Sequence, residues 1–165
     1  MPDAATAAIC NTSPLQYLHQ LRLVDLLPRL YSRLLVPTAV VGEIEAGRAL
    51  GHDLPDVPAL AWASVVTPTI AAFLPTVADL GAGERQVLAL AVETPGAVAI
   101  LDDALARQHG RLLRLRLTGT LGVLLRAKRE GAIAALRPVL DRLAELRFRV
   151  AADVRAEVLR LAGET

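Results

Sequence analysis

The sequence has few of the residues on which several protein classes depend. It contains one cysteine, Cys10, which excludes an intrachain disulfide and a cysteine zinc site. Aromatic residues make up only 3%, which argues against RNA readout on the aromatic base-stacking platforms of RRM-type domains. Charge or proline interrupts every apolar stretch within about 15 residues, fewer than the roughly 20 that span a bilayer. Residues 1–8 lack the basic start and apolar run of a signal peptide. We therefore expect a cytoplasmic protein without a membrane partner.

The composition instead indicates one globular domain with a large aliphatic core. Apolar residues make up 53% of the 165 residues, and a chain of this length usually forms a single domain. We expect that domain to span residues 1–165, with a core at about 6–150 and a C-terminal helix at 153–162. Charge is unevenly distributed: residues 1–101 carry 5 basic and 9 acidic side chains, and residues 102–165 carry 13 and 8. This asymmetry suits an acidic metal site beside a surface that binds a polyanion, although solvated helix faces would give the same balance.

Hydrophobic patterning predicts an α/β fold in three layers, with a mostly parallel sheet flanked by helices. Short apolar runs predict strands at 6–10, 34–36, 63–67, 97–101 and 114–117. Helical periodicity and capping residues predict helices from Pro14 through Leu21 and at 24–31, from 38, at 69–77, after 83, at 104–112, from 119 to 131, at 134–146 and at 153–161. Thr12 or Ser13 is the expected N-cap of the first helix.

Polar side chains follow three of the expected strands, where parallel strands present a functional crevice. Asn11 and Thr12 follow the first strand, Asp102 and Asp103 follow the strand at 97–101, and Thr118 and Thr120 follow the strand at 114–117. Two further acids, Glu43 and Glu84, stand early in helices. Clustered carboxylates are costly without a cation, and oxygen ligands select Mg²⁺ or Mn²⁺. Such ions activate water and stabilise charge on a phosphoryl group, which is the chemistry of phosphodiester cleavage.

Each of these side chains can also be explained by a role in folding or by exposure to solvent, without any role in catalysis. Glu84 lies in the first turn of an expected helix, where the helix dipole stabilises any acidic side chain. Glu43 can simply face solvent. Asn11 can form an Asx turn. Either Asp102 or Asp103 can be the N-cap of the following helix, and we favour Asp103 as the ligand with Asp102 as the cap or a second ligand.

Five short motifs in sequence order resemble those of a PIN-domain (VapC-like) branch that opens with Asn-Thr-Ser-Pro-Leu. They cover most of residues 6–150 and stand at Asn11 to Leu15, Pro37 to Glu43, Gly81 to Ala91, Leu101 to Arg107 and Thr118 to Gly131. The resemblance implies a PIN-like (Rossmann-like) fold and a Mg²⁺- or Mn²⁺-dependent ribonuclease. It also implies a VapBC-like toxin held by a small antitoxin, and a homodimer.

Carried over by position, the resemblance implies an acidic site of Asn11, Glu43, Glu84 and Asp103, with Asp102 beside it. RNA contacts or supporting roles fall on Thr12, Ser13, Thr120, Arg107, Arg126 and Lys128. Most PIN nucleases have aspartate at the position of Asn11, and an amide oxygen is a weaker ligand than a carboxylate. Two alternatives therefore stay open: a PIN-like module that binds RNA or protein without turnover, and a Rossmann-like binder of small molecules.

Overall fold

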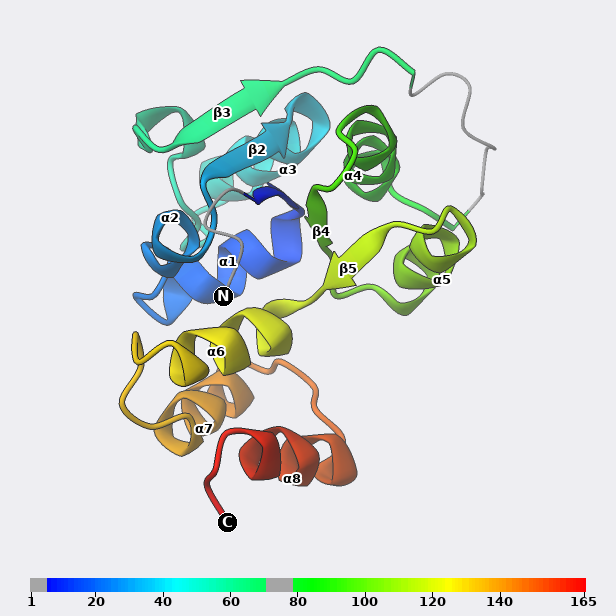
Figure 1. Ribbon diagram of the computed structural model, residues 1–165. Coiled ribbons are helices and arrows are strands. Elements are labelled where there is room, and N and C mark those ends of the chain that lie inside the picture. Colours follow the sequence, from blue (N-terminus) through cyan, green and yellow to red (C-terminus); the bar gives the residue numbers. More distant parts are fainter. Residues whose placement is uncertain (1–5, 71–78) are drawn as a thin grey trace.

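The computed structural model describes residues 6–70 and 79–165, and it has a five-stranded parallel sheet at its centre (Figure 1). The strands lie in the order β3-β2-β1-β4-β5. Every neighbouring pair is parallel. The strands are β1 (Ala7–Cys10), β2 (Arg33–Pro37), β3 (Ala63–Val66), β4 (Val98–Ile100) and β5 (Arg116–Thr118). The α/β fold class predicted from the sequence is confirmed.

Helices connect the strands and cover both faces of the sheet. They are α1 (Thr12–Gln20), α2 (Leu26–Leu30), α3 (Thr38–Ala49), a 3₁₀ turn (Val57–Ala59), α4 (Ala82–Glu93), α5 (Ala104–Leu112), α6 (Thr120–Arg129), α7 (Arg137–Glu145) and α8 (Ala152–Leu161). Figure 1 shows α4 and α5 on one side of the sheet, and α1 and α2 on the other. Helices α6, α7 and α8 gather below the sheet. The helix expected at 69–77 lies mostly outside the described residues, and its first two residues form a bend.

The strand order places a crevice between β1 and β4. From β1 the chain moves to β2 and β3 on one side, and it then returns to β4 on the other side. Right-handed crossovers therefore put the two sets of connecting helices on opposite faces. The connections diverge at the carboxyl ends of β1 and β4, where Cys10 pairs with Ile100. Such a switch point is the usual ligand site of an open parallel sheet.

Aliphatic side chains fill the core because both faces of the central strands are covered. Ile9, Cys10, Val36, Ala99 and Ile100 are fully buried. The edge strand β3 is only partly buried, as its mixed burial pattern shows. No helix among the described residues has both the length and the apolar character to cross a bilayer.

Several element boundaries differ from those predicted. Thr12 and Ser13 were expected to cap the first helix, but the N-cap is Asn11, and both residues lie inside the first turn of α1. Strand β5 starts two residues later than predicted, because Arg114 takes a left-handed conformation (φ 57°) that ends α5. Helix α7 starts at Arg137 rather than 134, where Glu164 accepts hydrogen bonds from the amides of Leu136 and Arg137.

Candidate active site

Three consecutive residues at the start of α1 each contact a different carboxylate. Thr12 Oγ1 donates to Glu43 Oε2 at 2.5 Å, and Ser13 Oγ donates to Asp102 Oδ2 at 3.1 Å. Asn11 Nδ2 donates a longer bond, 3.5 Å, to Glu84 Oε1. The acids come from α3, α4 and the segment after β4. The sheet edge therefore places the three carboxylates around one helix N-terminus.

The backbone of the sheet fixes this arrangement. The amide of Asn11 donates to the carbonyl of Ile100 at 3.1 Å, which joins the ends of β1 and β4. The amide of Leu101 in turn donates to the carbonyl of Thr118 at 2.9 Å. The residues that follow β1, β4 and β5 are thus held side by side by backbone hydrogen bonds.

Helices α3 and α4 meet through Glu43 and the Gly-Ala-Gly turn. The amide of Gly83 donates to Glu43 Oε1 at 3.0 Å. A Cβ atom on Gly83 would lie 2.7 Å and 2.8 Å from the two carboxylate oxygens of Glu43, so this close approach needs glycine. Gln86, one turn further along α4, accepts hydrogen bonds at the start of α3 from the Ala39 amide and the Thr38 hydroxyl. These contacts fix the N-termini of α3 and α4 against each other.

Asp102 and Asp103 have different surroundings. Asp102 is partly buried and accepts from the amide of Thr120 at 2.8 Å and from its hydroxyl at 2.7 Å, in addition to Ser13. Asp103 is exposed and is the N-cap of α5, where its Oδ1 accepts from the Ala106 amide at 2.8 Å. The cap is therefore Asp103, and the cap role that the sequence offered for Asp102 is wrong. Which of the two binds a metal stays a prediction.

The site carries negative charge that no ion pair of the described residues neutralises. Among residues 6–70 and 79–165, no ion pair includes Glu43, Glu84 or Asp102. Behind the site, burial raises the pKa of the Cys10 thiol, and the nearby charge of Asp102 raises it further. Cys10 is thus a protonated core residue and not a nucleophile.

The donor atoms at this edge suit a hard divalent cation, although the carboxylates do not form a closed cage. The available ligands are carboxylate, amide and hydroxyl oxygens, which Mg²⁺ and Mn²⁺ prefer. Asn11 is 3% exposed, and its Oδ1 is buried with no hydrogen-bond partner among the described residues. That oxygen is free to accept from a bound water or to bind a cation. However, no three acidic, histidine or cysteine side chains in the described part of the chain stand close enough together to hold a metal by themselves.

The other residues predicted to support the site fall into two groups. Thr120 is fully buried against Asp102, and Arg107 donates from its guanidinium to the Leu101 carbonyl at 3.0 Å.

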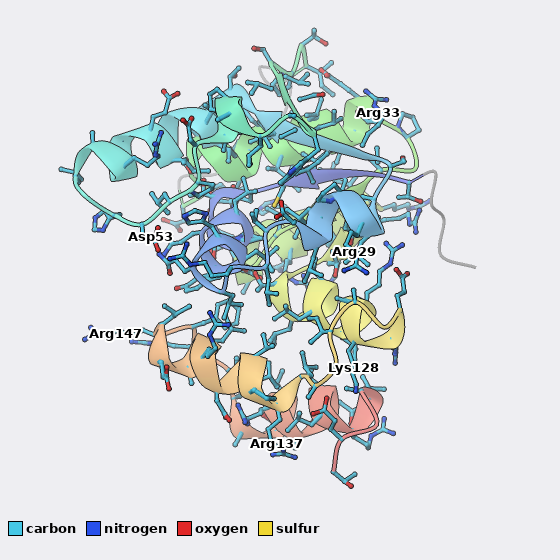
Figure 2. The ribbon with its side chains drawn as sticks, turned by 90° about the vertical axis from the view of Figure 1, so that its left-hand side faces the viewer. Arg29, Arg33, Asp53, Lys128, Arg137 and Arg147 are labelled. Carbon is cyan, nitrogen blue, oxygen red and sulfur yellow. The ribbon has the colours of Figure 1, made fainter. Side chains whose placement is uncertain are left out.

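Arg126 and Lys128 instead lie about 9 and 12 Å further along α6 from Thr120. Arg126 pairs with Glu130 at 2.9 Å and lies over the Tyr31 ring. Lys128 donates to the Ala134 carbonyl and lies near Glu164, where α6 approaches α8 (Figure 2). The structure therefore places these two cations away from the carboxylates.

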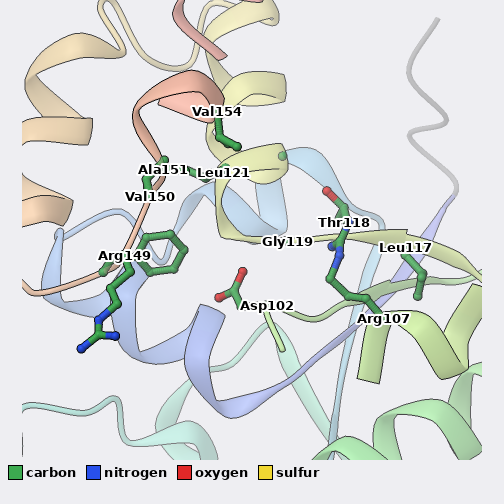
Figure 3. A pocket seen from close by; sticks show the side chains of 12 residues that line it. Asp102, Arg107, Leu117, Thr118, Gly119, Leu121, Arg149, Val150, Ala151 and Val154 are labelled. Carbon is green, nitrogen blue, oxygen red and sulfur yellow. The ribbon is translucent and has the colours of Figure 1, made fainter. Parts of the chain in front are cut away.

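A cleft of about 380 Å³ adjoins Asp102, and no pattern in the sequence predicted it. Its walls come from three segments: Asp102 and Arg107, residues 117–119 with 121 and 122, and residues 148–151 with Val154. Figure 3 shows the Asp102 carboxylate inside the cleft, Arg107 beside Thr118 and Gly119, and Arg149 at the rim, pointing outward. No local motif marks residues 148–154, because only the packing of α6 to α8 brings them to the site.

A comparison with known families places most of the chain in one family model. A family model described as a PIN domain matches residues 7–164. No curated protein shows significant similarity to the chain. The match includes α7 and α8, whereas the motifs recognised in the sequence end before α8.

Proposed function

The chain belongs to the PIN-domain family, and from this premise we propose that it is a ribonuclease that needs Mg²⁺ or Mn²⁺. The observation that carries the proposal is the set of three carboxylates at the switch point of the sheet, each held by one residue of Asn11 to Ser13. Three acids from different elements gain nothing for folding by approaching one another, because like charges repel. A site that binds a cation accounts for their convergence.

The chain's own residues would have distinct tasks. Glu43, Glu84 and Asp102 supply anionic oxygens, and the buried Oδ1 of Asn11 supplies a neutral one. Thr120 and Ser13 orient Asp102, because together they donate three hydrogen bonds to its two oxygens. A divalent cation bound there would activate water and stabilise the charge that develops on the phosphoryl group. Asp103 remains with α5 as its cap.

The biological setting follows from the resemblance of the motifs to VapC-like proteins. We propose a VapBC-like toxin in the cytoplasm, inhibited by a small antitoxin and active as a homodimer. RNA as the substrate is supported by the excess of basic residues after position 102, which suits a polyanion beside the acidic site.

A second function is supported by the donor set. Asn11 supplies no charge, and the carboxylates are not packed as a closed cage among the described residues. A PIN-like module that binds RNA without cutting it would keep the same fold and the same surface. An Asn11→Asp variant separates the two functions. If the amide limits metal binding, this variant should bind Mn²⁺ more tightly and cut RNA faster than wild type, whereas a pure binding module would gain neither property.

The direct test is cleavage of a mixed RNA substrate with and without Mn²⁺ or Mg²⁺. We expect metal-dependent cutting by the wild-type protein. We expect Asp102→Asn and Glu43→Gln to reduce cutting at least ~100-fold, which corresponds to about 2.7 kcal/mol in the barrier.

The matched controls are Asp25→Asn and Glu145→Gln, two exposed acids away from the site, and both should cut like wild type. Absence of cutting by purified wild-type protein that is free of antitoxin, with RNA binding retained, would refute the nuclease for the substrates tested and favour the binding module.

A further inference from the structure

The cleft beside Asp102 has features that the acidic site alone does not explain. Asp102 accepts a hydrogen bond from Ser13 at the carboxylate site, and it also lines the cleft. The cleft is open to solvent at the segment between α7 and α8, which carries Arg149. The cleft therefore continues directly from the proposed reaction site.

Its walls combine apolar surface with positive charge. Leu117, Leu121, Val150 and Val154 supply aliphatic contacts, and Phe148 supplies an aromatic ring. Phe148 is itself fixed by an edge-to-face contact with Tyr17, with ring centroids 4.9 Å apart. A ring held in this way offers a rigid surface at little conformational cost.

The charges in the cleft are arranged at two depths. Arg107 is partly buried and fixed by the Leu101 carbonyl, beside Thr118 and Gly119. Arg149 is exposed at the rim, with no ion-pair partner among the described residues. Two cations against one Asp102 leave the cleft net positive, whereas the neighbouring carboxylate site is net negative. Such a surface favours a ligand that is flat and apolar in part and anionic at its outer end.

We propose that this cleft holds one nucleotide of the RNA strand next to the phosphate that is cut. The proposal rests on the ribonuclease function above and names the part of the substrate that the site recognises. The volume of about 380 Å³ lies at the lower end of the range for small-molecule pockets and suits a single nucleotide. The base lies against the wall that contains Phe148 and Val154, and the flanking phosphate lies at Arg149. One fixed ring contacts one base, so this readout needs no aromatic platform.

The test separates binding from cleavage by measuring both. A fluorescently labelled ten-nucleotide RNA of mixed sequence is titrated in EDTA, where the metal-dependent reaction is off. We expect Arg149→Gln, which removes the rim charge, and Val154→Trp, which fills the cleft without changing charge, each to weaken binding at least ~5-fold. The matched controls are Arg129→Gln and Leu112→Trp, which alter exposed residues outside the cleft and should change binding less than ~2-fold.

A second measurement checks which base the cleft prefers. With Mn²⁺ and a randomised RNA, Phe148→Leu should change the base preference at one position beside the cut, while the metal dependence stays that of wild type. All variants are first compared by thermal unfolding. If Val154→Trp or Phe148→Leu folds poorly, Arg149→Gln still tests the proposal, because Arg149 is exposed.

The outcomes distinguish this inference from the proposed function. Wild-type cutting combined with unchanged binding in Arg149→Gln and Val154→Trp would overturn the nucleotide cleft and leave the nuclease intact. RNA binding that depends on both residues without any cutting would overturn the nuclease and support the cleft. Wild-type protein that binds no RNA in EDTA, or equal weakening by the control variants, would also overturn the cleft.

Discussion

Asp102 and Asp103 are adjacent in the sequence, and their side chains have opposite tasks. Asp102 is bound by Thr120 and Ser13 at the carboxylate site, and Asp103 caps α5. Either aspartate could be an N-cap by local preference, which is why the sequence alone could not assign them. The assignment depends on the position of Thr120, which is 18 residues away and is brought there by the pairing of β4 with β5.

The two residues should therefore separate activity from stability. Asp103→Ala removes the cap and should lower the free energy of unfolding by about 1 kcal/mol, with RNA cutting per folded molecule unchanged. Asp102→Asn should abolish cutting, because the amide removes the charge at the site. Urea unfolding and cleavage assays on the same preparations measure both effects. Loss of cutting in Asp103→Ala with Asp102→Asn still active would restore Asp103 as the ligand.

Gly83 gives a second prediction at the level of a single residue. A methyl group there would displace the Glu43 carboxylate, whose oxygens would lie 2.7 Å and 2.8 Å from the new Cβ. Because the Glu43 side chain is exposed and can turn toward solvent, and because alanine favours helices, Gly83→Ala should reduce RNA cutting without lowering the melting temperature.

Gly42→Ala is the matched control for that variant. Gly42 lies in α3 next to Glu43, and a Cβ atom there meets nothing within 4 Å. Gly42→Ala should stabilise the protein by up to about 1 kcal/mol and leave cutting unchanged. Equal cutting by Gly83→Ala and Gly42→Ala would show that the position of Glu43 against α4 does not matter for the reaction.

At the scale of elements, six helices end with a residue at positive φ. Three of these residues are glycine, as helix ends prefer, and the other three are Arg22, Arg114 and Arg147. After each arginine, an apolar residue donates its amide back to the last turn, as Leu23 does to the Leu18 carbonyl at 2.8 Å. The packing of that apolar residue holds an arginine in a conformation that favours glycine.

Arg22→Gly should therefore stabilise the protein. The substitution removes left-handed strain at φ 62° but also makes the unfolded chain more flexible, so we expect a net gain of about 0.5–1 kcal/mol. Arg111→Gly is the matched control, because Arg111 lies within α5, where glycine costs about 1 kcal/mol. Chemical denaturation should give opposite signs for the two variants. A loss of stability in both would show that Arg22 makes a contact worth more than its strain.

The sequence predicted the elements better than it predicted their boundaries or the cleft. Buried parallel strands are short apolar runs, such as 97–101, and they stand out between helical patterns. The start of β5 was misjudged because Arg114 has no residue-level signal for positive φ. The cleft was missed because its walls, such as Arg107 and Val154, come from segments that only tertiary packing joins. The first three residues of the motif at Asn11 to Leu15 contact Glu84, Glu43 and Asp102.

At the scale of the whole molecule, Glu164 ties the end of the chain to two other helices. Its carboxylate accepts from the amides of Leu136 and Arg137 at the start of α7, and it lies 3.9 Å from Lys128 Nζ in α6. These contacts close the group formed by α6, α7 and α8, and the cleft is lined in part by α6, α8 and the segment between α7 and α8. The two amide hydrogen bonds, followed by the charge of Lys128, lower the pKa of Glu164 from its ordinary value of 4.5.

This lowered pKa gives a pH-dependent contribution to stability. A carboxylate whose pKa falls on folding stabilises the native state above its unfolded pKa, and that contribution is lost as the pH falls through the folded pKa. Glu164→Gln should therefore lower the melting temperature at pH 7 by a constant amount down to about pH 5.5. The difference from wild type should then shrink as the pH falls below 4.5.

Thermal unfolding from pH 3 to 8 measures the effect, with Glu145→Gln, an exposed acid on α7, as the control that should match wild type throughout. Glu164→Gln also tests whether the contacts of Glu164 contribute to RNA binding at the cleft. If the tie holds α8 in place, Glu164→Gln should weaken RNA binding in EDTA at pH 7 in the same direction as Val154→Trp. A lower melting temperature with unchanged RNA binding would mean that α8 keeps its position at the cleft through Val158 and Leu159, which are buried, and that Glu164 stabilises only the start of α7.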